Sequence, residues 1–280
     1  MARKNVHGLC ELCQKQAKLC KSHYLGRVLH RMSFTGNEPP VVMTPKLVKV
    51  SPRQLWAHLL CEDCEQLLNE RGEKPFLALC NDGDNNFRLL NLVEVAMPMT
   101  QSPSVRVSFG GLLFRDIDGT FSETVVKYSG RAMGIATEAL AYYALSVLWK
   151  GSVYKWKTFQ GQESTVDLGK YQEPIRRYLT GEAGFPDGVY VITTACTDKG
   201  SPGMCFAPSK VSGSQFPMFS LLVRGIWFHI ITTDETPAGL SDLCCVRSTE
   251  KVLFKEDCLE RFLGAGRNIH RTATISPELR

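Results

Sequence analysis

The sequence predicts an α+β protein with a small cysteine-stapled head and a larger body. Two Cys-x-x-Cys pairs, Cys10/Cys13 and Cys61/Cys64, flank a basic N-terminal segment. Further along, residues 130–150 are apolar on most helical faces, and three later runs are strand-like between turn signals. We expect an N-terminal zinc treble clef, followed by an α+β domain with a long buried helix and antiparallel strands.

The treble clef is predicted from the order of elements in the head. After the first cysteine pair, residues 17–23 read as a short strand, and residues 24–32 have apolar residues at helical spacing. Ser51-Pro52 is typical of a helix start, and a helix should leave the second pair through Leu68. A cysteine knuckle, a short hairpin and a second knuckle at a helix start form a treble clef.

The body is predicted to begin near residue 100. Residues 87–121 look strand-like, and Arg224-Gly225 reads as the tight turn of a hairpin. The expected helices are 130–150, 168–179 and 255–263, and the expected strands are 189–194, 218–223 and 226–232. The predicted division is a zinc-binding domain at 1–100, an α+β domain at 101–270 and a flexible tail at 271–280.

The four paired cysteines are the predicted metal ligands. Two thiolates on a tight turn supply two of the four ligands of a tetrahedrally coordinated zinc ion. Together, Cys10, Cys13, Cys61 and Cys64 would supply all four. Such a closed site has no open position for water or substrate, so its zinc stabilises the fold and does not catalyse. Unmetallated knuckles or a redox disulfide are the alternatives.

A third pair with ligand spacing, Cys20-x-x-His23, leaves another assignment open. It would replace one knuckle or join a second metal site. A second full site needs further ligands, and only His7, His58 and Cys80 lie nearby in the sequence.

Composition limits the compartment and the partners. Eleven cysteines, adjacent Cys244-Cys245 and the lack of a charged-then-apolar leader favour a reduced, cytoplasmic protein. Residues 1–60 carry ten Lys or Arg and two Glu, a net charge of +8 against +5 for the whole chain. This charge favours nucleic acid as a partner, although an ordinary solvated face would also explain it. The longest apolar run is too short for a membrane span, so no membrane partner is expected.

The residues around the knuckles resemble a known family. Cys10-Glu-Leu-Cys13, then Ser22-His23-Tyr24-Leu25, then Leu-Leu-Cys61-Glu-Asp-Cys64-Glu65, resemble the zinc-bearing HNH, or ββα-metal, endonucleases. In that family two knuckles staple a hairpin to a helix, and a histidine on the hairpin activates water against a phosphodiester held by a divalent ion. The resemblance assigns this role to His23.

The sequence departs from the HNH pattern at three places. Ser22 stands where the family places an aspartate ligand, Glu65 stands where it places His or Asn, and the middle Asn has no counterpart near Trp56 or His58. Carboxylates suit Mg2+ or Mn2+, so Glu65 and Glu73, about two helical turns apart, are expected to rebuild a metal site opposite His23.

Most of residues 10–195 also resembles a group of largely uncharacterised bacterial proteins. The group shares the Ser-His motif, the Leu-Leu-Cys-x-x-Cys-Glu motif, a segment like residues 145–150 and a helix like residues 171–176. This resemblance implies a shared architecture and says less about activity.

Two functions from different classes follow. The first is a zinc-stapled protein that binds nucleic acid and cleaves phosphodiesters, with His23, Glu65 and Glu73 as catalytic residues; resemblance to HNH effectors suggests defence against phage or mobile elements. The second is a non-catalytic adaptor or sensor, whose zinc head is a scaffold for binding a protein subunit or a small ligand. A site wholly within residues 100–280 is a third alternative, but that region has no motif with a mechanism; Cys196, Cys205, Cys258 and His229 read as inert core residues.

Overall fold

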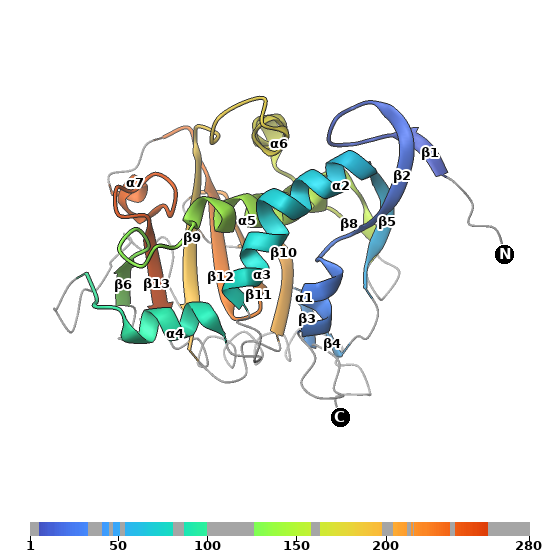
Figure 1. The fold of residues 1–280 in the computed structure, drawn as a ribbon. Coiled ribbons are helices and arrows are strands. Elements are labelled where there is room, and N and C mark those ends of the chain that lie inside the picture. The colour runs from blue at the N-terminus through green and yellow to red at the C-terminus, as the bar shows by residue number, and fades with distance from the viewer. Residues whose placement is uncertain are drawn as a thin grey trace.

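The computed structural model shows a mixed α+β protein in which helices cover one face of a large sheet (Figure 1). It describes residues 6–32, 41–44, 47–50, 54–80, 87–99, 126–157, 163–197, 204–211, 214, 216–235 and 239–256. The α+β class predicted from the sequence is therefore confirmed.

The described strands form three sheets. The head has an antiparallel sheet in the order β1-β2-β5, and the body has an eight-stranded sheet in the order β4-β3-β10-β11-β12-β9-β13-β6. The head strands are β1 Val6–Leu9, β2 Gln16–His23 and β5 Trp56–Cys61. The body strands are β3 Val41–Thr44, β4 Leu47–Val50, β6 Val126–Ser129, β9 Val189–Cys196, β10 Met204–Lys210, β11 Met218–Val223, β12 Ile226–Thr232 and β13 Val252–Glu256. The short pair β7 Trp156–Lys157 and β8 Glu163–Ser164 makes the third sheet.

The described helices are α1 Arg27–Met32, α2 Glu62–Leu68, the π-helix η1 Asn69–Glu73, α3 Lys74–Cys80, α4 Arg88–Val95, α5 Thr137–Val153, the 3-10 turn η2 Gly169–Tyr171, α6 Gln172–Thr180 and α7 Leu240–Leu243. Most of them gather on the face of the large sheet that packs against the main hydrophobic cluster (Figure 1). Helix α7 is the exception, because Leu240 packs in a second cluster with Ile192 and Phe254. The long buried helix predicted for the body is α5, which is buried on almost every face.

One hydrophobic cluster joins the head to the body. It contains Cys10 and Leu12 from the first knuckle and Phe228 from β12, with α5 between them. Phe76 of α3 links these parts because its ring stacks on Tyr143 at 4.1 Å and lies 5.9 Å from Phe228. Strands β3 and β4, which precede the second knuckle, also join the large sheet beside β10. The predicted boundary near residue 100 and the tail at 271–280 lie outside the described residues or at their edge.

The predicted hairpin in the body is confirmed. Val223 of β11 pairs with Ile226 of β12, which leaves Arg224 and Gly225 as a two-residue loop. Both residues have left-handed backbones, with φ of 53° and 74°. This is the turn whose twist matches that of the flanking strands, and glycine adopts it without steric cost.

Three local predictions are wrong. Residues 88–95 form helix α4 and not a strand, because Leu89 and Val93, one helical turn apart, are the buried positions. The helix expected to start at Ser51-Pro52 does not continue into the residues described from 54 onward, since the chain is extended from Trp56 and pairs with β2. Lys255 and Glu256 end strand β13, where pairing with β6 and β9 outweighs helical patterning. The rest of the predicted helix 255–263 lies outside the described residues.

Helices α2, η1 and α3 form a single helix with a π segment in the middle. Gly72, in that segment, lies so close to α5 that an added Cβ would be 2.9 Å from the Tyr142 ring and 3.3 Å from the Tyr143 Cα. In a regular α-helix, residues 65 and 73 would differ by about 80° around the axis. A π turn takes up one extra residue, which rotates Glu73 toward the face that carries Glu65.

Arg176 of α6 ties the body to the first knuckle. Its side chain is only 8% exposed, and its Nη1 donates to the Leu12 carbonyl at 2.8 Å. The rest of the guanidinium pairs with Glu173 and Glu182 at 2.8–2.9 Å. One planar group thus satisfies a knuckle carbonyl and two carboxylates, as bidentate arginine geometry allows.

Replacing Arg176 with Met should lower the free energy of unfolding by about 2–3 kcal/mol, because it removes charge-assisted hydrogen bonds and leaves the Leu12 carbonyl without its partner. Arg177→Met is the matched control, since that side chain is 53% exposed and only 4.0 Å from Glu182; its effect should stay within about 0.5 kcal/mol. Urea denaturation measures both. Equal losses in the two variants would contradict the anchoring role.

Candidate functional site

Two backbone turns present the cysteine pairs. Cys10 to Cys13 lie between β1 and β2, where the Gln14 amide donates to the Cys10 carbonyl at 2.8 Å and Gln14 takes a left-handed φ of 58°. Cys61 ends β5, and Cys64 lies in the first turn of α2. The strand-to-helix junction therefore places the second pair opposite the first.

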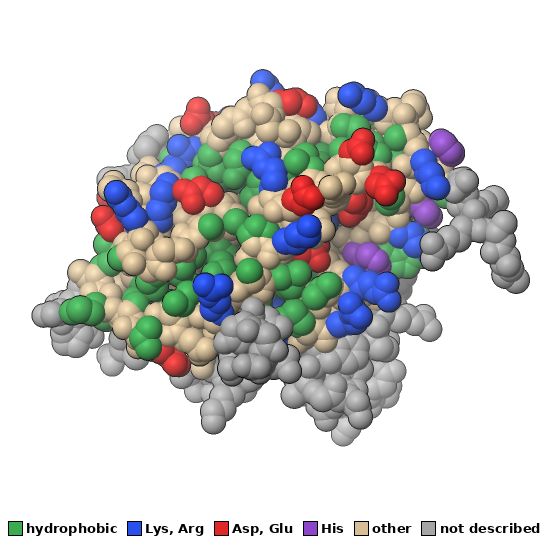
Figure 2. All heavy atoms as spheres, in the orientation of Figure 1, with side chains coloured by type: hydrophobic (Ala, Val, Ile, Leu, Met, Phe, Trp, Pro, Cys, Tyr) green, Lys and Arg blue, Asp and Glu red, His purple; other side chains and the backbone are tan. Residues whose placement is uncertain are grey.

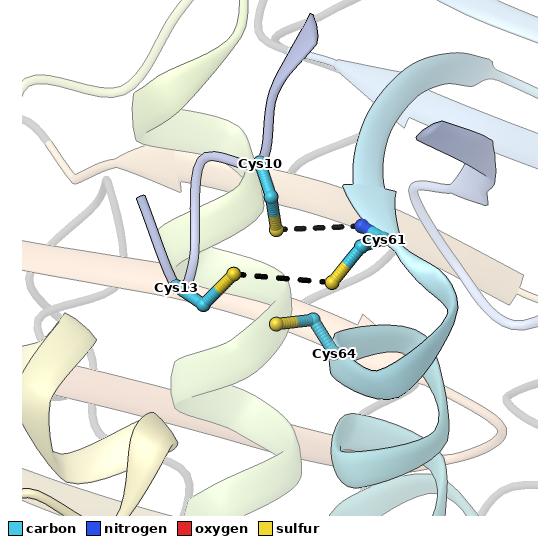
Figure 3. A group of neighbouring side chains, drawn as sticks. All are labelled: Cys10, Cys13, Cys61 and Cys64. Carbon is cyan, nitrogen blue, oxygen red and sulfur yellow. Dashed lines mark hydrogen bonds between the residues drawn. The ribbon is translucent and has the colours of Figure 1, made fainter. Parts of the chain in front are cut away.

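The four sulfur atoms converge on one point (Figure 3). All lie within 4.8 Å of one another, and the Cys13 and Cys61 sulfurs are 3.9 Å apart. A tetrahedral zinc ion with Zn–S bonds of about 2.3 Å requires sulfur separations of about 3.8 Å. Three of the cysteines are buried and Cys13 is partly buried. The arrangement is compatible with a structural zinc site.

The chemical type of the donor set also fits zinc. Hydrogen bonding from the Cys64 thiol lowers the pKa of Cys10, helped by the Cys61 amide, which donates to the Cys10 sulfur at 3.3 Å, whereas the same thiol pair raises the pKa of Cys64. A thiolate is the form that binds metal, and four sulfurs select a soft ion over Mg2+ or Ca2+. These are the four cysteines predicted from the sequence. No other group of three such ligands occurs in the part of the chain that the structure describes, so nothing supports a site at Cys20 and His23.

Two of the three predicted catalytic residues, His23 and Glu73, are each affected by the charge of the third, Glu65. His23 ends β2, Glu65 lies in α2 and Glu73 ends the π segment. Glu65 raises the pKa of His23, and it also raises that of Glu73. Since these are charge interactions, Glu65 lies near both the imidazole and the Glu73 carboxylate.

The imidazole of His23 is partly buried and favours its neutral form. Burial lowers its pKa first; Glu65 opposes this, while Lys150, Arg27 and Lys21 lower the pKa further. Among the described residues, Nδ1 has no hydrogen-bond partner and is shielded from solvent. A neutral imidazole with a pKa below its usual range accepts a proton at neutral pH.

The carboxylates are held at some electrostatic cost. Burial is the largest cause that raises the pKa of Glu73, against the attraction of Lys150. Gly26 makes room for this side chain, because a Cβ added there would lie 1.9 Å from Glu73 Oε1. The Oε1 atom of Glu65 is buried and has no partner within the described ranges. Buried carboxylate oxygens of this kind are costly unless a cation satisfies them.

Sequence reasoning missed Lys150 as a member of the site. It lies in the last part of α5, is only 7% exposed, and its Nζ donates to the His23 carbonyl at 3.0 Å. It also acts on the Glu73 carboxylate. The sequence does contain a clue to this role, because Lys150 lies on a helix that is apolar on most faces. A lysine buried on such a helix needs partners for its ammonium group.

Ser22 has a structural role in the packing of β2 against β5. A bulge lies between the pairs Leu19↔Cys61 and Lys21↔His58, which interrupts the β2–β5 ladder at Leu59 and Leu60. The fully buried Ser22 hydroxyl accepts from the Leu60 amide at 3.1 Å. Ser22 therefore satisfies a buried backbone donor.

No protein-family model, curated protein or solved structure matches this chain. No helix in the described part of the chain has both the length and the apolar character to cross a lipid bilayer.

The purified protein should contain one zinc ion per chain. Cys64→Ser should lose the ion and lower Tm by about 10 °C or more, because metal binding stabilises only the folded state. Cys20→Ser is the control, since Cys20 lies outside the sulfur cluster, and it should keep its zinc. Elemental analysis and thermal unfolding measure this. Retention of zinc by Cys64→Ser would contradict the assignment.

Glu73→Gln should raise the free energy of unfolding at pH 7. Because burial raises the pKa of Glu73, its carboxyl group binds a proton more tightly in the folded state than in the unfolded chain. The protonated carboxyl therefore contributes to the free energy of unfolding at low pH, and this contribution is lost as pH rises through the folded pKa. Glutamine has no such proton to lose. The gain should shrink as pH falls toward 4.

Denaturation at several pH values, without added divalent ions, measures this effect. Glu70→Gln is the control, because Glu70 is exposed and accepts a hydrogen bond from Gln66 on the helix surface. A loss of stability in Glu73→Gln at pH 7 would mean that this carboxylate is a structural ion-pair partner.

Proposed function

We propose that this protein binds nucleic acid and hydrolyses phosphodiester bonds at His23, Glu65, Glu73 and Lys150, on a treble-clef scaffold held by zinc. The observation that carries the proposal is the partly buried, predominantly neutral imidazole of His23 beside two carboxylates and an ammonium. Neighbouring titratable groups whose pKa values are shifted by burial and by one another's charge are typical of acid–base catalysis. The HNH resemblance assigns the same role to His23.

His23 is the general base in this proposal. The imidazole accepts a proton from water while the water oxygen forms a bond to phosphorus; the bond from phosphorus to the leaving oxygen breaks, and that oxygen takes a proton from solvent. Lys150 fixes the end of β2 through the His23 carbonyl, so it positions the imidazole. It also supplies a fixed positive charge near Glu73.

Glu65 and Glu73 are the proposed ligands of a catalytic Mg2+ or Mn2+ ion. With Lys150 they leave one net negative charge, and the Glu65 Oε1 atom is buried without a partner among the described residues. These properties favour a cation held by two carboxylates and water, the usual way in which proteins hold Mg2+. Such an ion would stabilise negative charge on the phosphate oxygens.

A second candidate function is a nucleic-acid or protein adaptor without catalysis. It is favoured by Ser22, whose hydroxyl is committed to the Leu60 amide, and by Lys150, which already supplies a cation near the carboxylates. In this case the zinc head is a binding scaffold. A role in defence against phage or mobile elements is the biological setting that the HNH resemblance suggests for either function.

Plasmid nicking with Mg2+ or Mn2+ tests the proposal. His23→Ala should lower the cleavage rate by about 10²–10⁴-fold, the usual contribution of a general base. His7→Ala is the matched control, because His7 lies on β1 and has no part in the proposed site. Both variants should keep the wild-type zinc content.

Two outcomes would remove the nuclease proposal: equal cleavage by wild type and His23→Ala, or no cleavage by the wild type. Binding to nucleic acid that weakens with salt, but without cleavage, would support the adaptor.

A further inference from the structure

The outer face of strands β2 and β5 carries four polar or aromatic side chains. Lys21 pairs in register with His58, and His23 pairs with Trp56. Their neighbours Ser22 and Ala57 are buried on the inner face of the same strands. We call Lys21, His23, Trp56 and His58 the outer patch.

Trp56 is the prominent member of the outer patch. Its side chain is 45% exposed, although isolated exposed apolar residues are common on protein surfaces. This indole, however, is held by two neighbours: the Lys21 ammonium lies 4.1 Å from the ring centroid, and the His58 ring meets it edge-on at 5.6 Å. His58 is itself fixed, because its Nδ1 lies 3.3 Å from the Leu19 carbonyl oxygen. The indole is therefore an ordered, flat and partly exposed surface.

The charge around the outer patch favours a polyanion. It contains Lys21 and no carboxylate of its own; Lys150 and Arg27 add positive charge near His23, against the negative charge of Glu65. Figure 2 shows histidine and Lys or Arg side chains gathered over β2, β5 and α1, while Asp and Glu side chains gather over α2. A cationic strip that contains an aromatic ring is the combination used by proteins that bind single-stranded nucleic acid.

We propose that the outer patch binds an unpaired nucleotide, whose base stacks on Trp56 and whose phosphate pairs with Lys21. In a duplex the base faces are stacked on their neighbours, so only a single strand, loop or frayed end presents a free face to an indole. Because Trp56 is the register partner of His23, the base would lie next to the proposed cleavage site. The inference deepens the proposed function by naming single-stranded nucleic acid as its substrate class.

The test is binding of labelled oligonucleotides to the full-length protein, measured by fluorescence anisotropy without divalent ions. Single-stranded DNA, single-stranded RNA and a DNA duplex of equal length are compared. Stacking on one aromatic ring contributes about 1–3 kcal/mol, so Trp56→Ala should weaken single-strand binding by about 5–150-fold. Trp56→Phe, which keeps an aromatic face, should recover most of that binding.

Two controls separate stacking from loss of fold or charge. Tyr154→Ala removes another half-exposed aromatic ring, 39% exposed at the end of α5, and should bind like wild type. Zinc content and Tm of Trp56→Ala should match wild type. Stronger binding to RNA than to DNA, or the reverse, identifies the preferred strand and supports the inference in either case.

The inference is overturned if Trp56→Ala binds single strands as wild type does, if it weakens duplex binding equally, or if the wild type binds no oligonucleotide. Cleavage distinguishes it from the proposed function. Loss of single-strand binding in Trp56→Ala, with no cleavage by any form, would support the outer patch and remove the nuclease.

Discussion

The convergence of four cysteine sulfurs is the constraint on which the head depends. Cys10 and Cys61 are 51 positions apart, yet the Cys61 amide donates to the Cys10 sulfur and all four sulfurs lie within 4.8 Å. This contact fixes the β1–β2 hairpin against the junction of β5 and α2. Since His23 ends β2 and Glu65 follows Cys64, the same contact sets their separation. A small sheet of three short strands has little core of its own, so a metal cross-link is an effective way to hold it.

The body contributes the Lys150 ammonium group, which contacts the end of β2 in the head. Helix α5 carries Lys150 to the end of β2, and Gly72 lets the π segment approach α5 closely enough for Glu73 to share that space. Buried ionisable groups lower stability unless they have hydrogen-bond or ion-pair partners. Such groups are therefore common at functional sites, where catalysis or binding uses them. Arg176 contributes differently, because it anchors the first knuckle to α6 and its charge is fully matched by neighbouring carboxylates.

Local sequence patterns predicted the elements whose form is decided locally. The Arg224-Gly225 hairpin was predictable because two residues, one of them glycine, separate two strand-like apolar runs. Helix α5 was predictable from its apolar length, although it begins at Thr137, after a turn at residues 131–134. Residues 88–95 were misjudged because Leu90, Leu92 and Val95 alternate, whereas burial of Leu89 and Val93 selects the helix. A strand such as β13 depends on partners far away in the chain, which a local pattern cannot specify.

The spacing of the two cysteine pairs was enough to predict the four sulfurs that converge, because two thiolates on one tight turn form one half of a tetrahedral site. The HNH resemblance added His23 as a candidate catalytic residue. Three relations in the head could not be predicted from the sequence: the Leu60 amide donates to Ser22, Lys150 donates to the His23 carbonyl, and Trp56 pairs in register with His23. These relations depend on the β2–β5 register, with its bulge, and on helix packing across 127 positions of chain. Contacts of that kind are set by the whole core and not by neighbouring residues.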